Sequence, residues 1–334
     1  MSGRASSSKP SSSKNIGAQK TKVLFFRDFR RFTGGDLKVW DYFNHVRSSR
    51  SHEALIRFTE DSVWSEDNPW NAAHEHVVRF GEPCAPDVLF VSGVDWRMIE
   101  RANRPESPIP IINLIQHVRH ADPHDKLGRN RFLPHKAIRI CVSPEVAETI
   151  ERTGRVRGPV FTIPDAIDLE RLARFARNGP RDLDLVVVAN KQPEAGHAIL
   201  EQLRDHGRSE IVDVRSPRHI VLDLMGRAAV TVFVPNPLEG FYIPALEGMA
   251  LGTIVVCPDC VGNRSFCLDL ENCFRPDHDV DAIVGAAREA LARRGELGAM
   301  VERAGETAAR HDLRRERKAF LEILERVDEL WPEA

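Results

Sequence analysis

Residues 232–253 carry the side chains whose types and spacing are best suited to ligand binding and catalysis. The segment reads as a buried strand, a proline-rich turn, the pair Glu239 and Gly240, and a helix that begins near Pro244. A helix start presents unsatisfied backbone N–H groups at the positive end of the helix dipole, so this turn suits a diphosphate. Gly240 would let a ligand approach the backbone closely. Glu247, about one turn into the helix, could accept both hydroxyls of a ribose, and Glu239 could reach the hydroxyls of a sugar.

The same segment resembles a known signature. It is similar to the C-terminal motif of the retaining glycosyltransferases of the GT-B fold, in the large family 4 group. That motif is an acid, seven residues and a second acid, with Gly-Phe after the first acid. Here it would be Glu239 and Glu247 with Gly240, Phe241 and the adjoining Tyr242. A structural strand-turn-helix with surface acids would produce a similar pattern.

Three more runs extend the resemblance, which covers most of residues 22–280 and is strongest over 230–256. The run ending at His117 resembles the strand that places a histidine near the reacting sugar, although a lone histidine at a strand end is often only structural. The run through Ser143 resembles a serine followed by a helix. The hinge run carries Asp165-Ala166 where the family usually has Asn-Gly.

One departure concerns the diphosphate. The family normally places an arginine and a lysine after the first strand of the second domain, and here Asn190 and Ala195 occupy those places. Lys191, from a shifted position, and Arg264 are the candidates to hold the phosphates instead. If neither reaches them, stabilisation of the leaving group is weakened.

Short apolar runs alternate with amphipathic segments along the whole chain, which predicts an α/β protein with parallel sheets covered by helices on both faces. A first set of strands falls between residues 23 and 163, and a second between 185 and 257. Ligands bind beyond the carboxyl ends of such strands. Together with the resemblance, this predicts a GT-B fold of two Rossmann-like domains facing a cleft. The expected organisation is a disordered basic tail (1–21), an N-terminal acceptor domain (22–163), a linker (164–181), a C-terminal donor-binding domain (182–312) and a last helix (313–334) that could return to the N-terminal domain.

The composition is that of an ordinary globular protein. The chain has 334 residues, 42% of them hydrophobic, and a net charge of -2, so no overall charge favours nucleic acid or an anionic membrane. No apolar run is long enough to span a membrane, and the N-terminus lacks the apolar core of a secretory signal, so we expect a cytoplasmic protein. The six cysteines do not suggest a disulfide scaffold. The spacing of Cys257 and Cys260 invites a zinc site, but Cys257 ends a strand pattern, and we expect no metal site.

Residues 33–36 break the chain and open a helix. Gly34 and Gly35 could therefore offer amides to the donor phosphates or to an acceptor, although a plain N-cap turn explains them equally well.

The resemblance implies a specific reaction. The donor would be a nucleoside-diphosphate sugar and the acceptor a hydroxyl, on a glycan, a lipid-linked sugar or a small molecule rather than on protein or nucleic acid. Transfer would retain configuration and need neither metal nor cofactor. Two alternatives stay open: another sugar enzyme of this fold, such as an epimerase or phosphorylase, or a binding protein that has lost the phosphate clamp and catalysis.

Overall fold

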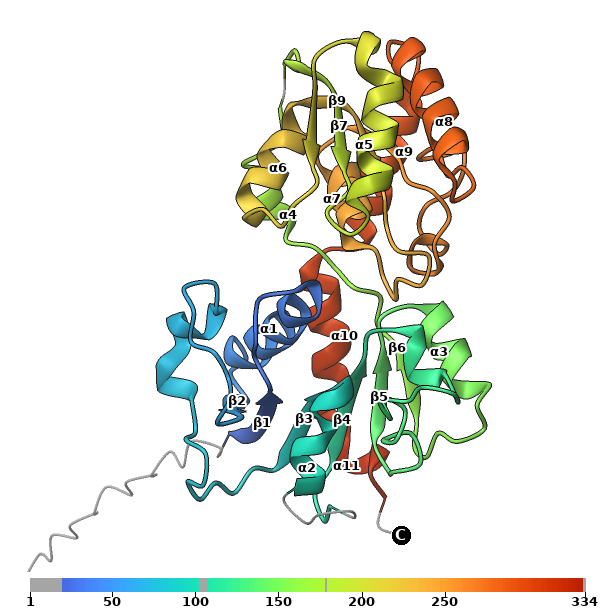
Figure 1. Cartoon of the computed structure of the whole chain (residues 1–334). Coiled ribbons are helices and arrows are strands. Elements are labelled where there is room, and N and C mark those ends of the chain that lie inside the picture. The colour runs from blue at the N-terminus through green and yellow to red at the C-terminus, as the bar shows by residue number, and fades with distance from the viewer. Residues whose placement is uncertain (1–19, 102–106, 178, 333–334) are drawn as a thin grey trace, which may run out of the picture.

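Two parallel β-sheets, each covered by helices, follow one another along the chain (Figure 1). The computed structural model describes residues 20–101, 107–177 and 179–332, so all but the last two residues of the predicted tail lie outside it. The first sheet has the strand order β2-β1-β3-β4-β5-β6. Its strands are β1 (Thr21–Arg27), β2 (His52–Phe58), β3 (Val88–Ser92), β4 (Ile111–Ile115), β5 (Ile138–Cys141) and β6 (Val160–Thr162).

The second sheet has the order β10-β9-β7-β8, and all of its strand pairs are parallel. Both sheets therefore present the carboxyl ends of their strands along one edge, where the connecting loops gather. The strands of the second sheet are β7 (Leu183–Val188), β8 (Ser209–Val212), β9 (Ala228–Phe233) and β10 (Ile254–Val256).

The burial of the strands explains why the sequence folds this way. All five residues of β3 and of β4 are buried, as expected of near-continuous apolar strands with helices on both faces. At the edge of the sheet, β2 alternates between buried and half-exposed residues. The helices accompanying the first sheet are α1 (Gly34–Arg47), α2 (Arg97–Arg101) and α3 (Pro144–Glu151), and short 3-10 turns lie at Pro69–His76, Gly93–Trp96 and Val118–Ala121.

The second sheet is covered by helices that alternate with its strands, and then by two more. The apolar pattern of residues 281–294 predicts one helix between β10 and the last helix of the chain. The structure has α8 there and a further helix, α9, which the sequence analysis did not identify. The helices are α4 (Leu169–Leu172) in the linker, α5 (Pro193–Leu203), α6 (Arg218–Arg227), α7 (Ile243–Ala250), α8 (Val280–Ala292) and α9 (Gly298–Arg310).

The last helices, α10 (Leu313–Glu325) and α11 (Val327–Leu330), lie against the N-terminal domain (Figure 1). Glu316 of α10 is fully buried and accepts hydrogen bonds from Lys38 (2.7 Å), from the ring Nε2 of His45 (2.9 Å) and from the backbone N–H of Ala166 (3.0 Å). This carboxylate therefore ties α1, the hinge and α10 together. Among the residues described, no helix combines the length and the apolar character needed to cross a membrane.

Candidate functional site

A cleft of about 560 Å³ lies between the two domains, at the carboxyl ends of both sheets. The loops after β1, β3 and β4 form its N-terminal wall, and the loops after β7 and β9 form the opposite wall. Most of the predicted site residues line it: Gly34, Gly35, His117, Asn190, Lys191, Glu239, Gly240, Phe241 and Tyr242. Glu247 and Arg264 do not.

Glu239 and Lys191 form an ion pair in this cleft. The Nζ of Lys191 lies 2.6 Å from the Oε1 of Glu239, which also accepts the backbone N–H of Asn236 at 3.2 Å. The same Nζ lies 5.5 Å from the ring centroid of Tyr242. The lysine that would replace the missing phosphate clamp is thus held beside the acid expected to orient a sugar.

Glu247 lies beneath the wall of the cleft, with its side chain directed toward α6. It is buried and accepts a hydrogen bond from Arg218, the first residue of α6, whose side chain lines the cleft. Burial raises the pKa of Glu247, and the positive charges of Arg218 and Arg171 act in the opposite direction. The carboxylate is therefore a buried charge that depends on a nearby cation or on hydroxyl donors.

Gly240 is where the two domains touch. A Cβ built at this position would lie 2.0 Å from the backbone oxygen of Gln116 and 2.8 Å from the Cα of His117. In addition, the hydroxyl of Ser143 donates to the Gly240 carbonyl at 3.0 Å. The glycine thus permits a close approach, and in this structure the approaching group is the N-terminal domain's own backbone.

The turn before α7 offers fewer free amides than the sequence suggested. The N–H of Tyr242, expected to help hold the diphosphate, donates to the carbonyl of Gly262 at 2.8 Å. It is engaged within its own domain because residues 261–263 fold over the turn, and it is not available to a ligand. The ring of Phe241 is stacked on that of Phe266 with centroids 4.9 Å apart.

Arg264 lies away from the cleft. Its Nε is 3.0 Å from Asp259, and about half of its side chain is exposed. Because the guanidinium is paired locally on the surface, the structure does not bring it to the other predicted residues. Of the two candidate cations for the diphosphate, only Lys191 lines the cleft.

His117 lies at the end of β4 and projects into the cleft. Its Nδ1 accepts the backbone N–H of Arg119 at 3.1 Å, which leaves Nε2 to carry the proton of the neutral ring. Burial, helped by the nearby positive charge of Arg119, lowers the pKa of His117 to about 3. The side chain is therefore a neutral hydrogen-bond donor at physiological pH.

This protonation state leads to a prediction. Replacing His117 with alanine should lower kcat about 10- to 100-fold, the equivalent of one hydrogen bond to a charged transition state, with little change in nucleotide affinity. Because the imidazole stays neutral above its lowered pKa, the kcat of the parent should show no inflection near pH 6.5. Rates measured between pH 5 and 9 for the parent and for His117→Gln, which keeps an N–H donor, test this. An inflection near 6.5 that disappears in the glutamine variant would contradict it.

Three arginines line the cleft in addition to the predicted site residues. Arg27, at the end of β1, is held by Asp36 (2.8 Å) and Asp95 (2.5 Å), Arg119 follows His117, and Arg218 begins α6. Arg27 is the last residue of β1, Arg119 lies in the 3-10 turn that follows β4, and Arg218 opens α6 after β8. Their place at or beyond the carboxyl ends of strands is the signal that the sequence offers for them.

The two cysteines with zinc-like spacing lie in the hydrophobic core. Cys257 and Cys260 are buried and free, and burial raises the pKa of the Cys260 thiol. The side chain of Asn263 donates to the Cys257 sulfur at 3.2 Å. Within residues 20–101, 107–177 and 179–332, no group of three His, Cys, Asp or Glu side chains stands where it could hold a metal ion.

Comparison with protein families finds a match to part of the chain. Residues 166–293 match the family described as glycosyl transferases group 1. This stretch contains the second sheet and the cleft loops that follow β7 and β9, so the similarity falls on the C-terminal wall of the cleft. No curated protein sequence matches the chain significantly.

Solved structures extend the likeness to nearly the whole chain. Sucrose-phosphate synthase from Thermosynechococcus elongatus is 12% identical with a TM-score of 0.68, over 92% of this chain and 99% of that one. HepE from Anabaena, in complex with UDP and glucose, is 13% identical with a TM-score of 0.71, over 91% and 99%. The lipopolysaccharide outer core galactosyltransferase WaaB is 13% identical with a TM-score of 0.66, over 91% and 99%. The predicted GT-B fold of two parallel-sheet domains is thereby confirmed.

Proposed function

We propose that this protein transfers a sugar from a nucleoside-diphosphate sugar to an acceptor hydroxyl, with retention of configuration and without a metal ion. The observation that carries the proposal is the convergence of the Lys191–Glu239 pair and Arg218, the partner of Glu247, on one cleft in a glycosyltransferase domain. A UDP donor is the first to consider, since HepE, which shares the fold, binds UDP and glucose.

The donor would lie mainly on the C-terminal domain. Glu247 would accept the ribose hydroxyls in exchange for Arg218, and Lys191 would contact the diphosphate. Across the cleft, Gly34 and Gly35 are the first residues of the 14-residue helix α1. Their backbone N–H groups lie at the positive end of the helix dipole and line the same cleft. Glu239 would orient the sugar.

The reaction would run through stabilisation of the leaving group. As the bond from sugar to phosphate breaks, negative charge develops on the diphosphate, and Lys191, Arg218 and the helix amides would stabilise it in place of a cation. The leaving phosphate would take the proton of the acceptor hydroxyl on the same face of the sugar, which retains configuration. The neutral His117 would donate its Nε2 proton as a hydrogen bond to the sugar, without transferring it.

Nucleotide binding tests the donor site directly. We expect UDP to raise the melting temperature in the presence of EDTA by about 5 °C at 100 times its Kd, because a ligand of the native state stabilises it by mass action. ADP, GDP, dTDP and CMP, measured in parallel, identify the base. Failure of every nucleotide to stabilise the protein would overturn the proposed donor site.

A second candidate function rests on Asn190 and Ala195, which replace the family's arginine and lysine, and on the engagement of Lys191 by Glu239. A binding protein of this fold would hold the nucleotide sugar without transferring it. Stabilisation by the nucleotide without release of nucleotide from the sugar donor, across a panel of hydroxyl acceptors, would favour it.

A further inference from the structure

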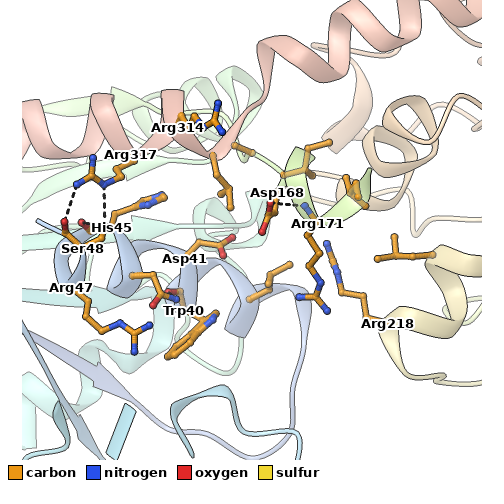
Figure 2. Close-up of a pocket in the computed structure, with 17 residues that line it drawn as sticks. Trp40, Asp41, His45, Arg47, Ser48, Asp168, Arg171, Arg218, Arg314 and Arg317 are labelled. Atoms are coloured by element: carbon orange, nitrogen blue, oxygen red, sulfur yellow. Dashed lines mark hydrogen bonds between the residues drawn. The ribbon is translucent and has the colours of Figure 1, made fainter. Parts of the chain in front are cut away.

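A second hollow, of about 580 Å³, lies beside the donor cleft at the junction of the domains (Figure 2). Helices α1 and α10 form one wall, and α4 and α6 form the other. We call it the junction groove. Five arginines line it: Arg47, Arg171, Arg218, Arg314 and Arg317.

Of the described residues, the two acids that line the junction groove, Asp41 and Asp168, form no ion pair with these arginines. Asp41 is held by the buried Lys38 at 3.0 Å, and Asp168 caps α4 by accepting the backbone N–H of Arg171 at 2.9 Å. Arg314 pairs with Glu170, and both of these side chains are largely exposed, so that pair is weak. His45 is engaged with Glu316.

Several of the arginines lack a carboxylate partner. In the part of the chain that the structure describes, Arg47 and Arg171 form no ion pair. Arg47 lies 5.5 Å from the ring of Trp40, and Arg317 donates to the hydroxyl (3.1 Å) and carbonyl (3.2 Å) of Ser48. These arginines can therefore take an anion without first breaking a salt bridge.

Arg171 and Arg218 approach one another from α4 and α6 (Figure 2). Both lie close enough to Glu247 to favour its charged form, but only Arg218 donates a hydrogen bond to it. The Nε of Arg218 is buried and has no hydrogen-bond partner in the structure. A buried N–H without an acceptor is costly, and two adjacent guanidinium groups repel, so an anion placed here would relieve both.

We propose that the junction groove binds a small molecule carrying at least two phosphate groups, distinct from the nucleotide-sugar donor. Guanidinium groups match phosphate oxygens in bidentate geometry, and groups on both walls would have to be bridged by more than one phosphate. Because the walls belong to different domains, the ligand favours the arrangement in which they face each other. Arg218 lines both the groove and the donor cleft. A ligand that binds Arg218 in the groove therefore competes with Glu247 for the same guanidinium group.

Inorganic pyrophosphate is a suitable probe, at constant ionic strength set with NaCl and with EDTA present. We expect it to raise the melting temperature of the parent by about 5 °C at 100 times its Kd, and still to raise it in the presence of saturating UDP. The double variant Arg47→Gln/Arg317→Gln should lose at least about half of the shift, since neither residue lines the donor cleft.

Two controls separate the groove from the cleft and from general charge. Arg50→Gln removes an exposed arginine three residues beyond Arg47 that does not line the groove, and Lys191→Gln alters only the donor cleft. Both should keep the full shift, and the unliganded melting temperature of the double variant verifies its fold. An absent shift in the parent, an equal shift in the double variant, or a shift abolished by UDP or by Lys191→Gln would each overturn the proposal. The UDP response of the same variants tests the donor site separately.

Discussion

Replacing Glu247 with alanine is expected to weaken UDP binding at least about 100-fold and to abolish the thermal stabilisation that UDP produces. The carboxylate is buried about one turn into α7, and a ribose would bring two hydroxyl donors to it. Each hydrogen bond to a charged group contributes about 1.5–3 kcal/mol, and two correspond to about 100-fold or more in affinity.

The variant should remain folded. Burial already disfavours the charged form of Glu247, so its removal relieves a desolvation penalty. Arg218 loses its partner, but its side chain is 28% exposed and can turn toward water. Isothermal titration with UDP, compared with Glu201→Ala on the exposed surface of α5, measures the effect. A Kd within threefold of the parent would show that Glu247 does not hold the donor.

Replacing Gly240 with alanine should lower kcat about 100-fold, the scale of loss that follows from a misplacement of about 1 Å in a reacting pair. The added methyl would lie 2.0 Å from the backbone oxygen of Gln116. The backbone fixes the position of both atoms, so no change of rotamer can relieve the clash. The two walls of the cleft must separate, which takes His117 away from Glu239. UDP affinity should fall much less, because the donor contacts lie mainly on one domain.

A second glycine provides the matched control. Gly285 lies on the exposed face of α8, where a new Cβ would meet nothing within 4 Å, so Gly285→Ala should leave turnover unchanged and raise stability by up to about 1 kcal/mol. Steady-state rates at saturating donor report the catalytic effect, and small-angle scattering reports the separation of the domains. Unchanged turnover in the Gly240 variant would mean that the contact with Gln116 does not set the working geometry.

Each of the ten strands in the described part of the chain overlaps a segment that the sequence predicted as a strand, because each is a short apolar run between clear breaks, although β8 begins two residues earlier than expected. Helix α9 was not identified, although its sequence is amphipathic: charged residues cover its exposed side, and its buried face consists of Met300, Ala304, Thr307 and Ala308. The signal was therefore present in the sequence, but three of the four buried residues are small, so the apolar face that packs against α7 is easy to overlook.

The position of Glu239 in the cleft could be predicted because the residue follows a strand of an α/β sheet, whereas Glu247, eight residues later, lies beneath the cleft wall. The candidate site was not predictable where the partner came from elsewhere. Nothing near Arg218 in the sequence indicates that it meets Glu247, 29 residues away. Likewise, the engagement of the Tyr242 amide by Gly262 depends on how a later loop folds back.

The buried cluster around Glu316 has a consequence for the order in which the protein can be completed during synthesis. Lys38 has no exposed surface, and its partner Glu316 is made only after the whole second domain; the distance between His45 and Glu316 is 271 residues. Without Glu316, Lys38 keeps Asp41 as a partner but loses its fully buried carboxylate, and breaking a buried charge network in this way is unfavourable. The N-terminal domain therefore emerges first from the ribosome and reaches its final packing only when α10 has followed it, so chains cut short before α10 should be substrates for chaperones and proteases.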